Sequence, residues 1–201
     1  MSKLMKLYYF DTEGKAEVLR LIFKFANVKF EDIRISKEDW PAIKNDSKFL
    51  TQQLPVLELE NGTILSESKA IVFYLGKLYG FMGKDLFEDS KILQYILGLE
   101  DSTEGGKAVV MEQDPVKKAE LGKAFFANVV KQLLDNYTKF LHENGGNGHL
   151  VGEKVTVADI FLYQTLRFGI TTMNLPIEQG FPVLNHFYSS MKEKVEKLSH
   201  A

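Results

Sequence analysis

Two adjacent tyrosines, Tyr8 and Tyr9, lie near the end of a short aromatic and apolar run, residues 4–10. A run of this kind predicts a buried strand, and neighbouring residues of a strand point to opposite faces. One tyrosine is therefore expected to face the core and the other a site at the carboxyl edge of the sheet, where open α/β sheets bind ligands. The alternative is that both are ordinary strand-forming residues.

A second polar group, Ser66, Glu67 and Ser68, begins a predicted helix. Helix N-terminal amides and a hydroxyl suit the carboxylate of a ligand, whereas the Glu67 carboxylate suits an ammonium group. A helix cap without any ligand is the simpler alternative.

Trp40 and Lys44 lie four residues apart, so on a helical turn they share a face. An indole N–H and an ammonium group both donate hydrogen bonds, which suits another carboxylate. The alternative is a partly buried tryptophan beside a solvated lysine.

Pro55 opens a predicted strand directly after Gln53 and Leu54. A cis bond before this proline would expose the Leu54 backbone for pairing with an extended ligand. A plain trans proline at the start of a strand is the alternative.

The elements that must position these residues belong to a chain of 201 residues, of which 45% are apolar and 26% charged. This length and composition allow a sizeable core and exclude an intrinsically disordered protein. The net charge is −2, from 25 basic and 27 acidic residues. Nucleic acid is therefore not expected as the main partner.

The chain contains no cysteine, which excludes disulfides, thiolate metal sites and a catalytic cysteine. Any sulfur chemistry must use the sulfur of a ligand. The four histidines lack metal-ligand spacing, so no metal is expected. No stretch approaches 18 uninterrupted apolar residues and the N-terminus lacks the apolar core of a signal peptide, so we expect a cytoplasmic protein without a membrane segment.

Up to residue 82 the chain alternates strands and helices. Strands are predicted at residues 4–10 and 30–35 with a helix at 15–26 between them, which makes the two strands parallel. A hairpin follows at 55–66, where Asn61-Gly62 supplies the positive φ values of a type I′ turn, and a helix at 67–79 ends this part. The result is a mixed four-stranded sheet with helices.

After residue 83 the pattern is helical. Amphipathic helices are predicted at residues 87–111, 115–142, 156–173 and 182–198, and Thr156 and Asp159 form a capping box. A strand-rich part followed by a helix-rich part predicts an α+β protein with two segregated domains, 1–82 and 83–201.

The motifs KLYYF, GKAEVLRLIF, EDWPAIK, QLPVLE and SESKAIVFYL occur in this order in the first half, and VGEKVTVADI occurs in the second. In this order and spacing the chain resembles the cytosolic glutathione transferases over nearly its whole length. EDWPAIK and YF-x3-GKAE resemble the sigma class in particular, the group that contains glutathione-dependent prostaglandin D synthases and lens S-crystallins. The resemblance implies a thioredoxin-like N-terminal domain that binds glutathione and an all-helical C-terminal domain that supplies an electrophile pocket.

The resemblance also implies roles for individual residues. Tyr9 takes the catalytic position, and glutathione is bound by Lys15, Trp40, Lys44, Gln53, Leu54, Pro55, Glu67 and Ser68. Among these, Trp40 and Lys44 match the pair for the glycine carboxylate. Lys15 stands where the family usually has arginine, and Glu67 where it has glutamine.

Two more matches concern the rest of the tripeptide. Gln53 and Leu54 match the residues before the family's cis proline. The Leu54 main chain would pair with the cysteinyl unit, and Glu67 with Ser68 would hold the γ-glutamyl end. The family completes this grip with an acid of the partner subunit in a homodimer, for which Glu100 and Asp101 are the candidates.

The activity that follows is conjugation of the glutathione thiolate to small hydrophobic electrophiles. A free thiol titrates at about pH 8.5, and a tyrosine hydroxyl that donates to the sulfur lowers that pKa. Glutathione is the only co-substrate implied, without a metal. Glutathione-dependent prostaglandin isomerisation and a catalytically weak, crystallin-like binding role are the alternatives.

Overall fold

The computed structural model describes residues 3–198, apart from the side chains of residues 102–104. The described residues fall into two compact units. One consists of residues 3–81 with residues 195–198, and the other of residues 82–194. Each unit is described by itself below.

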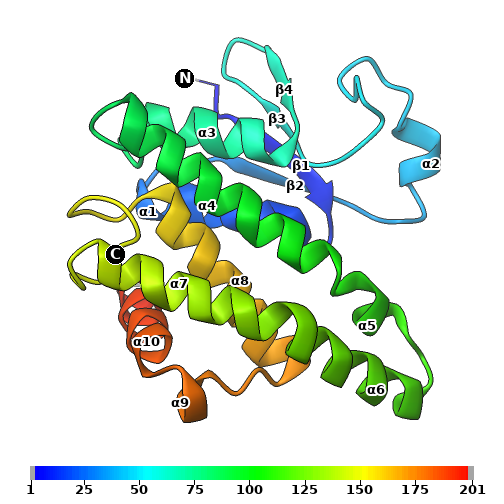
Figure 1. Cartoon of the computed structure of the whole chain (residues 1–201). Helices are drawn as coiled ribbons and strands as arrows, with labels where there is room; N and C mark the ends of the chain where they lie inside the picture. Colours follow the sequence, from blue (N-terminus) through cyan, green and yellow to red (C-terminus); the bar gives the residue numbers. More distant parts are fainter. Residues whose placement is uncertain (1–2, 199–201) are drawn as a thin grey trace. The chain divides into compact units, whose positions relative to one another are not determined.

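The first unit is built on a four-stranded sheet, in agreement with the sequence (Figure 1). Its strands are β1 (Lys6–Phe10), β2 (Glu31–Ile35), β3 (Val56–Glu58) and β4 (Ile64–Ser66), in the order β2-β1-β3-β4. β1 and β2 are parallel because a helix connects them, and the other two pairs are antiparallel. The mixed sheet predicted from the sequence is confirmed.

The hairpin between β3 and β4 is confirmed, but its predicted type I′ turn is wrong. Gly62 has a φ of 85°, whereas Asn61 is not among the residues with positive φ. The Gly62 N–H donates to the Leu59 carbonyl at 2.8 Å, and the Asn61 side chain accepts from the Thr63 N–H at 2.9 Å. The chain therefore turns one residue earlier than predicted, and glycine alone takes the left-handed conformation.

Helices of the first unit pack on this sheet. A 3-10 turn, η1 (Gly14–Ala16), leads into α1 (Glu17–Phe25), and the short helix α2 (Trp40–Ile43) follows β2. α3 (Ser68–Leu78) follows the hairpin and packs against α1, as Figure 1 shows. Apolar residues at helical spacing, such as Leu19 and Ile22, are fully buried and hold α1 in the core.

The second unit contains helices and no strand among its described residues. Its elements are α4 (Leu86–Glu104), α5 (Lys107–Met111), α6 (Pro115–Phe125), the π-helical turn η2 (Phe126–Val130), α7 (Lys131–Glu143), α8 (Val157–Met173), α9 (Ile177–Gly180) and α10 (Pro182–Lys197) up to residue 194. The single helix predicted over 87–111 is wrong, because the chain breaks between α4 and α5 at Gly105 and Gly106. Paired glycines are a frequent helix break.

α8 begins at the capping box that the sequence predicts. The Asp159 carboxylate accepts from the Thr156 N–H at 2.8 Å and from the Leu150 N–H at 2.8 Å. Asp159 is completely buried, so these bonds replace the water that its charge has lost. The cap therefore holds the chain before α8 as well as the helix itself.

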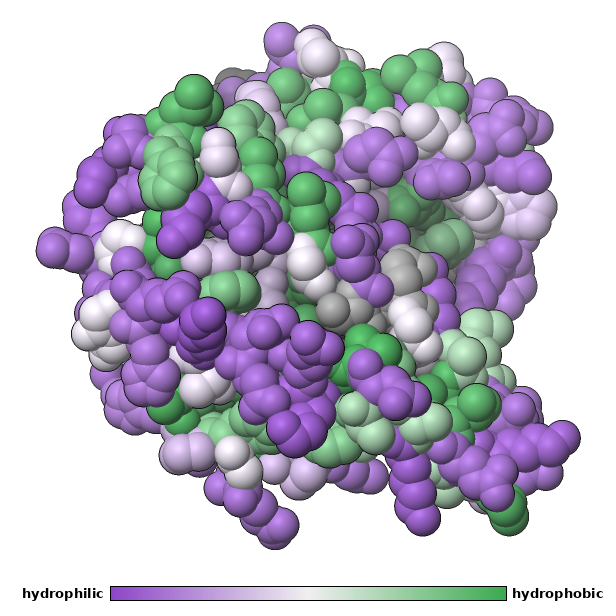
Figure 2. All heavy atoms as spheres, in the orientation of Figure 1, coloured by the Kyte–Doolittle hydropathy of each residue, from purple (hydrophilic) through white to green (hydrophobic). Residues whose placement is uncertain are grey.

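On the face in Figure 2, hydrophilic side chains predominate and hydrophobic ones stand in small groups between them. None of the described helices combines the length and apolar character needed to cross a membrane.

Candidate functional site

The register of the sheet brings three of the predicted site residues to one edge. Tyr8 of β1 pairs with Val56 of β3, and Val56 pairs with Ser66 of β4. The next residue outward on each of these strands is Tyr9, Pro55 and Glu67, respectively. Since neighbouring strands are about 4.8 Å apart, this row spans about 10 Å. We call Tyr9, Pro55 and Glu67 the edge row.

Tyr8 belongs to the opposite face of β1, and its hydroxyl has a partner inside the fold. It donates to Glu58 Oε2 at 2.7 Å, and its ring packs edge-on against Phe49 with the ring centroids 5.8 Å apart. Burial first, and then the hydrogen bond to the Glu58 carboxylate, raise the pKa of Tyr8 well above its usual range. Tyr8 is therefore a structural residue.

Tyr9 is as buried as Tyr8, at 9% against 8% exposure, but its hydroxyl is used differently. Its oxygen accepts a hydrogen bond from the backbone N–H of Lys15 at 3.0 Å. An oxygen that accepts in this way keeps its own proton for another acceptor, and the incoming N–H dipole polarises the O–H bond. The Tyr9 hydroxyl is thus prepared to donate to an anion.

Gly14 makes this arrangement possible, although sequence reasoning assigned it no role of its own within its polar turn and the GKAE motif. It has a φ of 40°, and a Cβ placed on it would lie 2.4 Å from the Tyr9 hydroxyl oxygen. Only glycine leaves the space that the tyrosine ring occupies, and only glycine adopts this backbone without strain. Its proximity to Tyr9 depends on the three-dimensional path of the turn.

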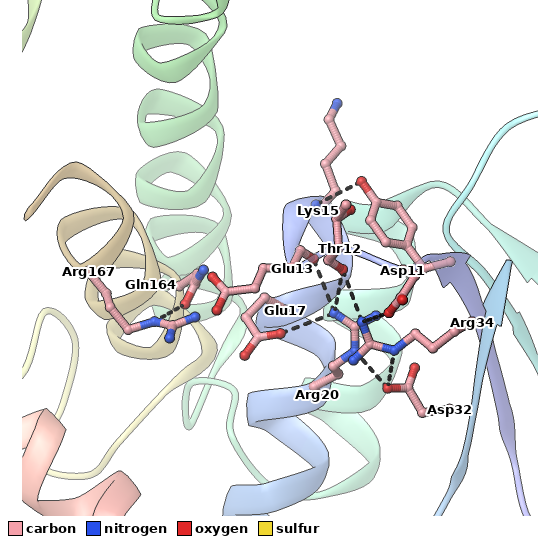
Figure 3. Close-up of polar contacts among 11 residues, drawn as sticks. Asp11, Thr12, Glu13, Lys15, Glu17, Arg20, Asp32, Arg34, Gln164 and Arg167 are labelled. Carbon is pink, nitrogen blue, oxygen red and sulfur yellow. Dashed lines mark hydrogen bonds and ion pairs between the residues drawn. The ribbon is translucent and has the colours of Figure 1, made fainter. Parts of the chain in front are cut away.

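Arg20 is a second residue that sequence reasoning missed. It lies on α1, beneath the turn that follows β1 (Figure 3). Its guanidinium donates to the carbonyls of Thr12 and Glu13 at 3.2 and 3.1 Å, and its Cζ lies 5.9 Å from the centroid of the Tyr9 ring. The signal that could have found it is a cation within an otherwise apolar helix, LRLIF.

Lys15 contributes its backbone to the site as the structure stands. Its N–H is the donor to Tyr9, whereas its side chain is exposed. The predicted contact of its ammonium group with glutathione remains a prediction.

Trp40 and Lys44 share one helical turn, as expected from their spacing. The Lys44 N–H donates to the Trp40 carbonyl at 2.9 Å at the end of α2. The indole packs edge-on against Phe10 and Phe49, with ring centroids 5.8 and 5.0 Å apart. Because Phe10 directly follows Tyr9, these contacts place α2 beside the end of β1.

Gln53 and Leu54 precede a cis proline. The Leu54–Pro55 bond is cis, as the resemblance implies, and the plain trans alternative is wrong. Pro55 is buried, Leu54 is half-buried and Gln53 is exposed. The described backbone contacts of the sheet pair β3 from Val56 onward, so Leu54 lies just outside the ladder.

Glu67 and Ser68 begin α3 in an unusual way. Glu67 is exposed and has a φ of 70° and a ψ of 115°, a conformation that non-glycine residues rarely adopt. Ser68, the first helical residue, is buried, and the buried Ser66 hydroxyl has no hydrogen-bond partner among the described residues. Strained backbone of this kind is enriched at ligand sites.

Glu100 and Asp101 lie on α4 in the second unit, half-buried and exposed, respectively. Their predicted role requires the partner subunit and stays a prediction. Within the described residues, no group of three or more histidine, aspartate or glutamate side chains has the arrangement of a metal site.

A hollow of about 330 Å³ lies elsewhere, between α4, η2 and α7 of the second unit. Tyr95, Tyr137 and Phe140 line it together with amide side chains such as Gln94. None of the residues predicted from the sequence lines this hollow, so the edge row remains the candidate site.

Family models match both parts of the chain. The model for "Glutathione S-transferase, N-terminal domain" matches residues 5–77, and the model for "Glutathione S-transferase, C-terminal domain" matches residues 100–197. Among curated proteins, glutathione S-transferase 1 of Ascaris suum is 34% identical over 178 residues, covering 80% of this chain and 78% of the relative. S-crystallin SL11 of Nototodarus sloanii is 34% identical over 161 residues, covering 80% and 77%.

Solved structures agree with these matches. A sigma class glutathione S-transferase of Fasciola hepatica superposes with a TM-score of 0.87 at 30% identity, covering 100% of this chain and 95% of that one. A prostaglandin synthase D of Nilaparvata lugens superposes with a TM-score of 0.81 at 29% identity, covering 97% and 93%. A monomeric glutathione S-transferase of Necator americanus gives a TM-score of 0.85 at 31% identity, covering 98% and 96%.

Proposed function

The chain belongs to the glutathione S-transferase family, and we propose that it conjugates the thiolate of reduced glutathione to small hydrophobic electrophiles, with Tyr9 as the group that stabilises the thiolate. The observation that carries this proposal is the state of the Tyr9 hydroxyl. Its oxygen accepts from the Lys15 N–H at 3.0 Å, so its proton is available for the sulfur. Tyr8, the other candidate, donates to Glu58 within the fold.

The chemical step uses this proton without transferring it. The Tyr9 O–H donates to the glutathione sulfur, which stabilises the thiolate relative to the thiol and lowers the pKa of the thiol from its free value of about 8.5. Each unit of lowering corresponds to about 1.4 kcal/mol of differential stabilisation. The thiolate then attacks an electrophilic carbon of the second substrate.

The edge row orients the tripeptide. The backbone of Leu54, just beyond the β3 ladder, pairs with the cysteinyl unit, which brings the sulfur toward Tyr9 on the neighbouring strand. Ser68 and the first amides of α3, which follows Glu67 one strand further out, hold the γ-glutamyl end, because these amides attract its carboxylate.

The other end of the tripeptide lies toward α2. Trp40 and Lys44 hold the glycine carboxylate from this helix, assisted by Gln53 and the side chain of Lys15. The packing of Trp40 on Phe10 supports this assignment, because it fixes α2 next to the strand that carries Tyr9.

The assembly and location belong to the same proposal. We propose a cytoplasmic homodimer in which Glu100 or Asp101 of the partner subunit completes the γ-glutamyl site, with domains at residues 1–82 and 83–201. The monomeric relative from Necator americanus makes the oligomeric state worth measuring directly. Analytical ultracentrifugation of the purified protein measures the oligomeric state. If the protein is a monomer, no partner subunit supplies an acid and this part of the proposal is wrong.

The central test removes each of the two tyrosine hydroxyls in turn. Tyr9→Phe should retain binding to immobilised glutathione and lower the turnover of chlorodinitrobenzene about 10²-fold or more, the effect of losing a hydrogen-bond donor to the reacting anion. The pKa of the bound glutathione thiol, measured from the ultraviolet absorbance of its thiolate as a function of pH, should be higher in this variant. Tyr8→Phe is the matched control and should retain turnover. Full activity in Tyr9→Phe with loss in Tyr8→Phe would reverse the assignment.

Glutathione-dependent prostaglandin isomerisation is the second candidate. The superposition on a prostaglandin synthase D favours it, and the same thiolate at Tyr9 would serve that reaction. Turnover of prostaglandin H2 by the purified protein decides this point. Retention on glutathione without turnover of either substrate would instead favour a binding role, such as the similarity to an S-crystallin suggests.

A further inference from the structure

An acid and two arginines form a compact cluster next to the catalytic strand (Figure 3). Arg20 of α1 donates from Nε to Asp32 Oδ2 at 3.0 Å, and Arg34 donates from Nε to the same oxygen at 2.7 Å. Arg34 is the register partner of Tyr9 in the parallel β1–β2 pair. A single carboxylate oxygen thus joins a helix cation to a strand cation beside Tyr9.

Both arginines also bind the backbone of the turn after β1. The Thr12 carbonyl accepts from Arg20 Nη1 at 3.2 Å and from Arg34 Nη1 at 3.3 Å, and the Glu13 carbonyl accepts from Arg20 Nη1 at 3.1 Å. The cluster therefore fixes two successive peptide units of one short turn.

That turn leads directly to the groups that fix the Tyr9 hydroxyl. Gly14 follows Glu13, and the next N–H, from Lys15, is the donor to Tyr9. A shift of the Thr12 and Glu13 carbonyls is passed on within two residues to this donor. Misplacement of a reacting group by about 1 Å is enough to lower a rate strongly.

We propose that Arg20 and Arg34, joined through Asp32, are positioning residues of the transferase reaction. They hold the turn so that the backbone of Gly14 and Lys15 meets the Tyr9 hydroxyl in the geometry that leaves its proton for sulfur. This inference rests on the proposed role of Tyr9. Arginine suits the task because Arg20 donates from Nε to the carboxylate and from Nη1 to the two carbonyls, whereas a lysine has a single donor nitrogen.

Stability and positioning make different demands on Arg34. Its side chain is 36% exposed, and an ion pair at that exposure contributes little to folding because water screens it. Its bond to the Thr12 carbonyl nevertheless acts on the catalytic turn. Loss of Arg34 should consequently affect turnover more than stability.

Arg34→Gln is the main variant. We expect kcat/KM for chlorodinitrobenzene to fall about fivefold through kcat, with the thiolate titration of bound glutathione moved to higher pH and the thermal midpoint nearly unchanged. Arg34→Lys should recover part of the loss, because it retains one charged donor. Lys29→Gln removes an exposed cation before β2 and is the control that should leave all readouts unchanged.

Arg20→Lys tests the inner member of the cluster. It should lower kcat/KM about 20-fold, because one ammonium nitrogen replaces a guanidinium that binds Asp32 through Nε and two carbonyls through Nη1. Arg20 is 10% exposed, so this variant is more prone to misfolding, and Arg34→Gln keeps the proposal testable in that event.

A double-mutant cycle with Tyr9→Phe separates this inference from the proposed function. If the arginines act through the tyrosine hydroxyl, Arg34→Gln should not lower kcat/KM any further in the Tyr9→Phe background. The same fivefold loss in both backgrounds would overturn the inference. Unchanged turnover in Tyr9→Phe alone would refute the proposed function instead.

Hydrogen exchange of the Lys15 amide gives a readout that needs no substrate. Arg34→Gln should speed this exchange several-fold relative to Lys29→Gln, because the bond to Tyr9 opens more often. Unchanged exchange would show that the cluster does not hold the turn, whatever the role of Tyr9 in turnover.

Discussion

The first turn of α8 and the first turn of α3 use similar polar side chains in opposite ways. At α8, Thr156 and Asp159 are buried, and the Asp159 carboxylate accepts three hydrogen bonds from the chain. At α3, Glu67 is exposed at a φ of 70°, and no described side chain caps the helix. One helix start is completed by side chains of the protein, whereas the other has no side-chain cap on its first amides.

The two tyrosines of β1 repeat this contrast at atomic scale. The Tyr8 hydroxyl donates to Glu58, so its proton is used within the fold. The Tyr9 hydroxyl accepts from a backbone N–H, so its proton is left over. In both comparisons, we expect the closed arrangement to serve stability and the open one to serve the proposed site. Changes at closed sites should therefore lower stability, and changes at open sites should lower activity.

Asp159→Ala should give the largest effect at the closed helix start. It removes the carboxylate that accepts three hydrogen bonds and leaves their buried donors without a partner. We therefore expect the free energy of unfolding to fall by about 3 kcal/mol. Urea denaturation at neutral pH measures the change. Activity per folded molecule should remain.

Asp135→Ala is the matched control. This carboxylate is paired with Lys131 on α7 but is 53% exposed, so its loss should cost less than about 0.5 kcal/mol. Equal losses in the two variants would show that burial of the Asp159 network does not set its contribution.

Gly14→Ala should lower activity at the open site. The new methyl group would lie 2.4 Å from the Tyr9 hydroxyl oxygen, so the ring must move, and we expect kcat/KM to fall about 30-fold. Steady-state turnover of chlorodinitrobenzene measures this loss.

Gly62→Ala controls for backbone strain. Gly62 also has a positive φ, but a Cβ there would meet no atom within 4 Å. This variant should lose about 1 kcal/mol of stability and keep its activity. Activity retained in Gly14→Ala would mean that the hydroxyl position does not matter for turnover.

The sequence predicted what depends on local patterns. The mixed sheet follows from residue periodicity and turn residues, and the α8 cap follows from the spacing of Thr156 and Asp159. The order of motifs identified the family and, with it, the cis bond before Pro55. Residues 9, 55 and 67 are distant in the chain, yet the strand register brings them to one edge.

What the sequence did not predict depends on contacts made after the chain has folded. Arg20 meets Asp32 and the turn only when α1 packs on the sheet, and Gly14 meets Tyr9 only through the path of that turn. The hairpin turn differed from its prediction because Asn-Gly is compatible with more than one turn type. The break at Gly105 had a local signal that the amphipathic pattern of its flanks concealed.

Glu67→Gln should give the smallest effect and refine the contrast between the two helix starts. The Glu67 charge opposes the attraction of the α3 N-terminus for the γ-glutamyl carboxylate, so removing it should lower the KM for glutathione about two- to fivefold. Because Glu67 is exposed, the gain should shrink as salt is added. Glu60→Gln, in the neighbouring hairpin, is the control that shows whether the loss of any nearby negative charge changes the KM for glutathione. A higher KM in Glu67→Gln would show that its carboxylate holds the ligand's ammonium group, in which case the open helix start selects for a cation as well as an anion.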